Sequence, residues 1–89
     1  MTGPAVMKTK IRVQFYAQLR DLAGTTHLDL NVRENATVSD LLEQIYVKFP
    51  ALSAHNKSIL VGAGLEFVDR NYKLKPGDEI SIMPPVQGG

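Results

Sequence analysis

The sequence contains no cysteine, and this absence excludes several kinds of chemistry at once. Without cysteine the chain has no disulfide framework and no thiolate ligand for a metal, so it does not depend on an oxidising compartment. Any sulfur chemistry must therefore use sulfur supplied from elsewhere. The two histidines, His27 and His55, lie far apart and have no companions at metal-ligand spacing. We interpret them as surface or turn residues and expect no metal site.

Long apolar runs and clusters of one charge are also missing. No apolar stretch approaches the ~20 residues that cross a membrane. Ten Lys and Arg residues against nine Asp and Glu residues give a formal charge of +1, spread along the chain. We therefore expect neither a membrane nor a nucleic acid as a partner. The first six residues have no basic segment and no long apolar segment, so no secretory signal is expected and the protein is predicted to be cytoplasmic.

The common signatures of nucleotide binding and covalent catalysis are absent as well. Gly62 and Gly64 stand in a segment that lacks the third glycine and the following helix of a dinucleotide site. No Gly-Lys-Ser or Gly-Lys-Thr sequence occurs. A triad of Ser39 or Ser58 with His55 has no nucleophile-elbow motif around either serine. We expect no cofactor bound by this chain and no ATP site of its own.

Alternation of apolar and polar residues predicts most of the strands. Three half-buried strands are expected at residues 8–16, 27–33 and 79–83. A short apolar run, Ile59-Leu60-Val61, suits a strand buried on both faces and interrupted by Gly62 and Gly64. Residues 65–68 add a short edge strand. Residues 17–24 are rich in helix formers, which predicts a wide connection with one or two helical turns.

The clearest helix signal begins at Thr37. The segment Thr37-Val38-Ser39-Asp40 has the form of a capping box, with Asp in the reciprocal position. One apolar face follows from the spacing of Val38, Leu41, Leu42, Ile45 and Phe49. Pro50 disfavours helical geometry at Phe49, so the helix is expected to end there.

A single helix with one apolar face needs a sheet to cover, and 89 residues suffice for one such domain. The inward-facing sheet residues are expected to be Ile11, Val13, Phe15, Leu28, Leu30, Val32, Ile80 and Ile82. The order of elements predicts an α+β roll of the β-grasp type, a mixed sheet of four to five strands on one main helix, with its first and last strands together in mid-sheet. We expect a flexible arm at 1–7, the domain at 8–83 and an extended tail at 84–89.

The chain ends in Pro84-Pro85-Val86-Gln87-Gly88-Gly89. Six extended residues reach roughly 20 Å, and the two prolines stiffen the start of this arm. Gly88 and Gly89 have no side chains and can pass through a narrow channel. The terminal carboxylate, with a pKa near 3.5, is a poor electrophile and needs activation, for instance as an acyl-adenylate made by another protein. A disordered tail without chemistry is the alternative.

Three segments together resemble the small subunit of molybdopterin synthase, a family of ubiquitin-like sulfur carriers. They are residues 15–24 (FYAQLRDLAG), residues 77–80 (GDEI) and the terminal PPVQGG. The resemblance implies that a ubiquitin-activating-type enzyme adenylates Gly89 with MgATP, and that a sulfur donor protein supplies the sulfur of a terminal thiocarboxylate. It further implies that the tail inserts into the large synthase subunit and donates sulfur to cyclic pyranopterin monophosphate, a step of molybdenum cofactor biosynthesis. The chain would then be a non-catalytic, sulfur-donating subunit of a heterotetrameric transferase.

The resemblance also implies roles for single residues. The insertion path is lined by Pro84, Pro85, Val86 and Gln87, while Gly88 provides clearance. Arg20 matches the arginine of an F-x-A-x-x-R pattern and is a candidate for partner contacts, with a solvated helix charge as the alternative. Met83 stands where an aromatic residue is common, and its adaptable apolar side chain suits docking. Three other functions stay open: a carrier for thiamine or cysteine synthesis, a protein modifier that forms isopeptide bonds, and a plain interaction domain.

Overall fold

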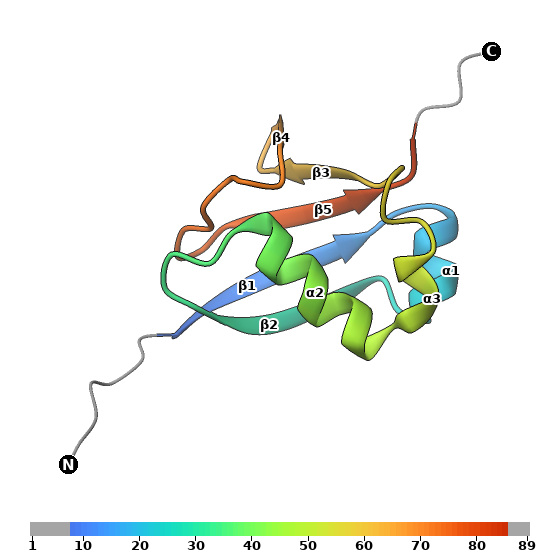
Figure 1. Ribbon diagram of the computed structural model, residues 1–89, viewed down its shortest axis with the longest axis horizontal. Helices are drawn as coiled ribbons and strands as arrows, with labels where there is room; N and C mark the ends of the chain where they lie inside the picture. The colour runs from blue at the N-terminus through green and yellow to red at the C-terminus, as the bar shows by residue number, and fades with distance from the viewer. Residues whose placement is uncertain (1–7, 86–89) are drawn as a thin grey trace.

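The computed structural model describes residues 8–85 (Figure 1). The expected arm at 1–7 and the last four residues, 86–89, lie outside this range. The elements in chain order are β1 (Lys8–Phe15), α1 (Gln18–Ala23), β2 (His27–Arg33), α2 (Val38–Lys48), α3 (Pro50–Ser53), β3 (Leu60–Ala63), β4 (Glu66–Val68) and β5 (Glu79–Met83). None of the helices in this range is both long and apolar enough to cross a membrane.

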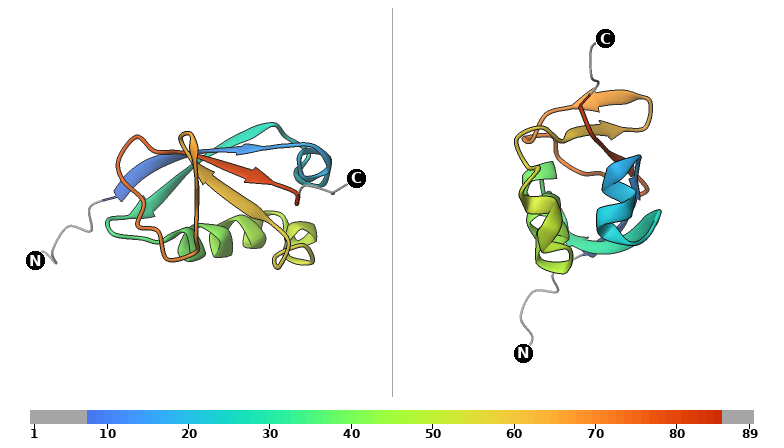
Figure 2. Two further views of the ribbon diagram at one scale, coloured as in Figure 1. Left: turned by 90° about the horizontal axis from the view of Figure 1, so that it is seen from above. Right: turned by 90° about the vertical axis from the view of Figure 1, so that its right-hand side faces the viewer.

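The five strands form one mixed sheet in the order β2-β1-β5-β3-β4. β1 and β5 are parallel, whereas the other three neighbouring pairs are antiparallel. The helix α2 lies across one face of this sheet, and the two views of Figure 2 show the two layers. The predicted α+β class, the mixed sheet and the central position of the first and last strands are confirmed.

The core lies between α2 and the inner face of the sheet. Seven of the eight sheet residues expected to face inward are buried, and Ile11, Val13, Ile80 and Ile82 are fully shielded from solvent. Burial of each such side chain contributes ~1.5–3 kcal/mol. Leu28 is only half-buried and packs against the margin of the core. Phe49 is half-buried too, and its ring meets that of Phe15 edge-on with centroids 5.8 Å apart.

The third strand differs from the expectation at both of its ends. β3 begins at Leu60 and continues through Gly62, which was expected to interrupt it. Gly62 pairs with Ser81 of β5 on one side and with Phe67 of β4 on the other. Strand pairing uses only backbone groups, so the missing side chain does not prevent it. Leu60 is half-buried, so burial on both faces was wrong. The turn comes at Gly64, whose φ of 62° suits the first central position of a two-residue hairpin loop.

The capping box at the start of α2 is confirmed in both directions. The Thr37 backbone N–H donates to Asp40 Oδ2 at 3.0 Å, and the Asp40 backbone N–H donates to Thr37 Oγ1 at 3.3 Å. The hydrogen bond from the Thr37 backbone lowers the pKa of Asp40 below its ordinary value, and the nearby charge of Arg33 acts in the same direction. The ionised carboxylate of Asp40 therefore stabilises the folded chain.

This capping box predicts a pH dependence of stability. A lowered pKa in the folded state means that the contribution of Asp40 is complete above its unfolded pKa of about 3.9 and is lost as the pH falls through the lower folded pKa. Urea unfolding from pH 7 to pH 2 should show a smaller loss in Asp40→Asn than in the wild type. Thr37→Ala should lower the free energy of unfolding by about 1 kcal/mol at pH 7. Glu43→Gln, on the same helix outside the box, is the control, and an equal effect in Glu43→Gln would contradict the assignment.

Candidate functional site

The C-terminal segment leaves the sheet from its centre. Because β1 and β5 are parallel neighbours, their C-terminal ends lie next to each other at one end of the sheet. There the Tyr16 backbone N–H donates to the Ile82 carbonyl at 3.1 Å. Met83 pairs with Leu60 of β3 on the other side. Pro84 and Pro85 follow directly, and neither has an N–H with which to continue a ladder. The prolines therefore end the pairing and direct the chain away from the sheet.

The residues predicted as functional are only partly described by the structure. Met83, Pro84 and Pro85 are half-buried at the end of β5. Arg20 is exposed on α1, the helix that follows β1. Four predicted residues lie outside the described range, namely Val86, Gln87, Gly88 and Gly89. Their roles in insertion and in carrying the acyl group stay predictions.

Beside Met83, the outer face of the sheet carries exposed apolar side chains. Phe67 is 71% exposed, Leu65 fully exposed and Tyr16 42% exposed. Together with Met83 they surround a hollow of about 180 Å³. We call these four side chains the root patch. Isolated exposed apolar residues are ordinary, but a contiguous group beside a hollow is typical of an interaction surface.

Strand register explains why these residues meet. Phe67 lies opposite Gly62, and Gly62 lies opposite Ser81, so the three share the outer face across β4, β3 and β5. Ile80 and Ile82 face the core on either side of Ser81, which leaves Ser81 and Met83 on the outer face. Chain segments far apart in the sequence thus meet where the tail begins.

Gly62 forms the floor of the hollow. A Cβ at this position would lie 3.3 Å from Met83 Cε, 3.5 Å from the Glu66 carbonyl oxygen and 3.8 Å from Ser81 Cβ. The first distance is tight, although the end of a methionine side chain can move. Any larger side chain at position 62 would fill the hollow. Because Gly62 has no side chain, its backbone forms the bottom of the hollow, between the apolar side chains of the root patch. A hollow of this shape can accept an apolar side chain of another protein.

The chemistry of the root patch is that of binding. Its lining is apolar or uncharged apart from Glu66. Within residues 8–85 no polar or charged side chain is buried, and no group of three His, Asp or Glu residues is placed to hold a metal ion. The sequence pattern did not reveal Leu65, Phe67 or Tyr16 as site residues. The signal that finds them is the register of β3 with β4 and β5, which local periodicity does not contain.

The arrangement of the sheet and helix defines a ubiquitin-like β-grasp protein. A solved structure from Pyrococcus furiosus, described as a putative molybdopterin converting factor, subunit 1, matches with a TM-score of 0.80 and 26% identity. The match covers 88% of this chain and 99% of that one. The solution structure of the small archaeal modifier protein 1 from Methanosarcina acetivorans matches with a TM-score of 0.76 and 30% identity, over 93% of this chain and 99% of that one.

The chain belongs to the ThiS family, whose family model matches residues 13–89. A curated relative from Chlamydomonas reinhardtii, the molybdopterin synthase sulfur carrier subunit, is 35% identical to it. That similarity covers 90% of this chain and 99% of the relative. The resemblance to this group of sulfur carriers is thereby confirmed.

The exposure of the root patch predicts how its residues affect stability. Phe67→Ser should change the free energy of unfolding by no more than about 0.5 kcal/mol, because most of the ring is already in water. Ile82→Ala, on the same side of the sheet as the core, should cost about 2–5 kcal/mol. Chemical denaturation of both variants checks the contrast. A large loss in Phe67→Ser would show that the ring supports the fold and is not a surface for binding.

Proposed function

We propose that this chain is the sulfur carrier subunit of a molybdopterin synthase, with Gly89 as the residue that carries the sulfur. One observation supports this most strongly. The central strand β5 ends at Met83, beside an apolar hollow, and the family match continues through Pro84 and Pro85 to Gly89. The similarity to molybdopterin synthase sulfur carrier subunits favours molybdopterin synthesis as the pathway.

The proposed chemistry takes place on the terminal carboxylate. An oxygen of the Gly89 carboxylate attacks the α-phosphorus of ATP, and pyrophosphate leaves. A sulfide equivalent from a donor protein then attacks the acyl carbon and displaces AMP, which leaves a thiocarboxylate. Since the sequence has no nucleotide-binding loop, a separate adenylating enzyme binds the MgATP. In the synthase the thiocarboxylate sulfur displaces an oxygen substituent of cyclic pyranopterin monophosphate. Water then hydrolyses the acyl–sulfur bond, which leaves the sulfur on the pterin and returns the Gly89 carboxylate for another activation.

The root patch provides the contact that brings the tail into its partner. Apolar side chains around a hollow bury well against a complementary surface, and aromatic residues such as Tyr16 and Phe67 are common at the centre of interfaces. The patch adjoins Pro84, so a protein bound there receives the tail at its own surface. We propose the large synthase subunit as that protein. Arg20 on α1 forms no ion pair within residues 8–85 and would add a contact to an acidic group of the partner.

Conversion of the carboxylate to a thiocarboxylate can be seen directly in the mass. Incubation with an adenylating enzyme, MgATP and a sulfur donor should add about 16 mass units, because sulfur replaces oxygen during the acyl transfer of the activated terminus. Intact mass spectrometry and sequencing of the C-terminal peptide would locate the change at Gly89. A chain lacking Gly89 is the control and should gain nothing. An unchanged wild-type mass, under conditions that load a known carrier, would refute the proposal.

The contact with the large subunit is tested by two substitutions in or beside the root patch, one that fills the hollow and one that removes an apolar side chain. Gly62→Leu should fill the hollow and Phe67→Ser should remove an anchor, so each should weaken binding by about tenfold or more, which corresponds to 1.4 kcal/mol. Isothermal titration against the large subunit measures this. Val47→Ser is a matched control because Val47 is 82% exposed on α2, away from the root patch. Equal affinities for all three variants would place the contact elsewhere.

A ubiquitin-like protein modifier is the second candidate. The 30% identity with the small archaeal modifier protein 1 favours it. A modifier would use the same adenylate but pass its acyl group to a lysine amine, giving a branched peptide in which Gly89 is joined to lysine. Finding that peptide, without a thiocarboxylate, would select the modifier. A carrier for thiamine or cysteine synthesis would gain the same 16 mass units but would not copurify with a pterin-binding large subunit.

A further inference from the structure

Within residues 8–85 no strand pairs with the outer edge of β2. The Phe15 backbone N–H donates to the Thr26 carbonyl at 2.9 Å, which continues the register of β1 with β2 by one residue beyond the Gln14–His27 pair. Hydrogen-bonded pairs alternate along an antiparallel ladder. The backbone groups of Asp29, Asn31 and Arg33 therefore point away from β1. No strand of the described chain lies beside them, because β2 is the first strand of the sheet order.

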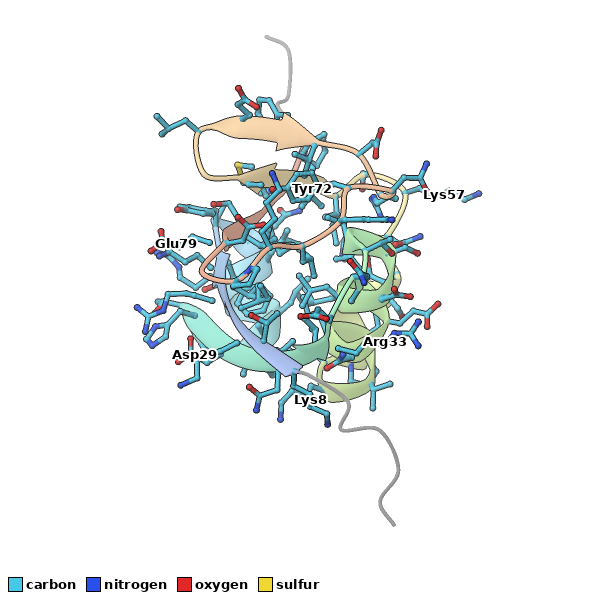
Figure 3. All side chains as sticks on the ribbon, turned by 90° about the vertical axis from the view of Figure 1, so that its left-hand side faces the viewer. Lys8, Asp29, Arg33, Lys57, Tyr72 and Glu79 are labelled. Atoms are coloured by element: carbon cyan, nitrogen blue, oxygen red, sulfur yellow. The ribbon has the colours of Figure 1, made fainter. Side chains whose placement is uncertain are left out.

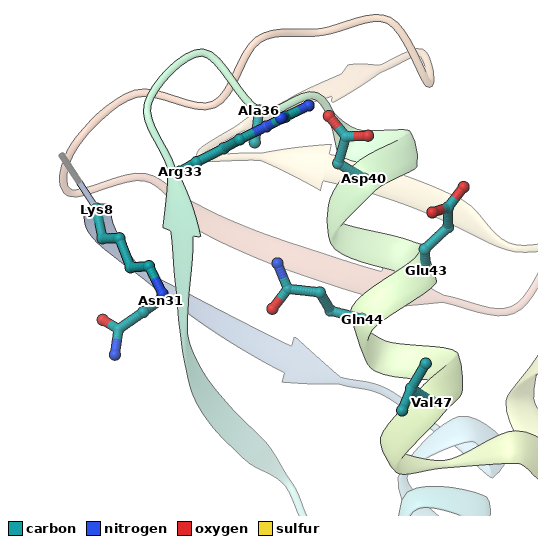
Figure 4. Close-up of a pocket in the computed structure, with 8 residues that line it drawn as sticks. All are labelled: Lys8, Asn31, Arg33, Ala36, Asp40, Glu43, Gln44 and Val47. Carbon is teal, nitrogen blue, oxygen red and sulfur yellow. The ribbon is translucent and has the colours of Figure 1, made fainter. Parts of the chain in front are cut away.

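This edge is long and uncovered, unlike the edge at the other end of the sheet. β2 has seven residues, whereas β4 has three. An open groove of about 520 Å³ separates β2 from α2, and Asn31, Arg33, Gln44 and Val47 are among the residues that line it (Figure 4). Long exposed edges invite pairing with another strand, and short ones discourage it.

When two copies of β2 are placed side by side, one register brings opposite charges together. If two copies of β2 pair antiparallel about a two-fold axis at Asn31, Asp29 of each copy lies opposite Arg33 of the other. A pairing centred on Asp29 would place two aspartates opposite each other, and one centred on Arg33 would place two arginines together. A pairing centred on residue 30 places His27 opposite Arg33. Opposite charges stabilise cross-strand pairs, whereas like charges destabilise them.

We propose that β2 forms a dimer with β2 of a second copy of this chain, centred on Asn31. The two charges are available for it. Asp29 Oδ1 accepts from Arg12 Nε at 3.2 Å, and its second oxygen can accept from the other copy. Arg33 is exposed and forms no ion pair within residues 8–85 (Figure 3). In Figure 4 its side chain extends toward Asp40 of α2, so pairing with the other copy requires it to turn toward the edge.

The backbone groups at the centre of the edge are available as well. Thr25 Oγ1 donates to the His27 carbonyl and the Ala36 backbone N–H donates to the Arg33 carbonyl, so both ends of the edge are partly engaged. The backbone groups of Asp29 and Asn31 between them have no such partner in residues 8–85. The pairing is thus short, and we expect a weak dimer that forms and separates rapidly.

This dimer would leave the root patch accessible. The two-fold axis of an antiparallel pair is perpendicular to the sheet, so the two sheets join into one and both α2 helices lie on the same face. β3 and β4, with the root patch, lie at the far ends of the joined sheet. Each copy would therefore present its own C-terminal segment to a separate partner. The proposal does not depend on the chemistry of Gly89.

Sedimentation equilibrium of the full chain at low salt, from micromolar to millimolar concentration, tests the dimer. The wild type should show a concentration-dependent dimer. Asp29→Arg and Arg33→Asp should each raise the dissociation constant about tenfold or more, because two attractive pairs become repulsive. Asp21→Arg makes the same charge change on α1 and should have no effect. A wild type that stays monomeric throughout, or an equal effect of Asp21→Arg, would overturn the proposal.

Mixing the two charge variants tests the register itself. Asp29→Arg pairs with Arg33→Asp through two opposite-charge contacts, so an equimolar mixture should form a heterodimer although neither variant dimerises well alone. Asn31→Pro should abolish the dimer, because proline removes an outward N–H that β1 does not use. Circular dichroism checks that each variant is folded. A mixture no more dimeric than its components would exclude this register, and a dimer that persists in Asn31→Pro would exclude β2 as the contact.

Discussion

The parallel pairing of β1 with β5 is the contact on which the remaining structure depends. It joins the first and last strands in mid-sheet, with Val13 opposite Ile80 and Phe15 opposite Ile82, and these buried side chains belong to the core. It is also a long-range contact, which loop-closure entropy makes costly to form. Because β5 lies in the middle of the sheet and pairs with both β1 and β3, the C-terminal segment starts from the central strand.

The two faces of this sheet differ in what surrounds them. The inner face is covered by α2 and is entirely apolar at its centre. The outer face carries Phe67, Tyr16 and Met83 near the end of β5, around the bare backbone of Gly62. A carrier has to release its partner after each cycle, and a small patch with one hollow suits such a transient contact better than a large apolar interface would.

The loops between the strands are held by hydrogen bonds that no local sequence pattern predicted. Arg70, after β4, donates to the Asn56 side chain at 3.0 Å, to the Asn56 carbonyl at 2.8 Å and to the Ile59 carbonyl at 3.0 Å. Tyr46 of α2 donates to the same Asn56 side chain at 2.7 Å. Three segments distant in the sequence meet at one amide, and only the folded chain reveals it. The wrong prediction that Gly62 interrupts the strand has the same cause. Glycine locally disfavours a strand, but Gly62 pairs with both β4 and β5, and those contacts are not visible in the local sequence.

The sequence by itself determined the local structure of this protein: the strands of β1, β2 and β5, the capping box of α2, and the proline-proline and glycine-glycine pattern of the last six residues. These features depend on residues within a few positions of one another, so periodicity and capping chemistry suffice to predict them. Only the tertiary structure decided which exposed side chains surround the hollow and which backbone groups of β2 point outward. Both follow from the register between strands, which is determined by contacts across the whole chain and not by any segment alone.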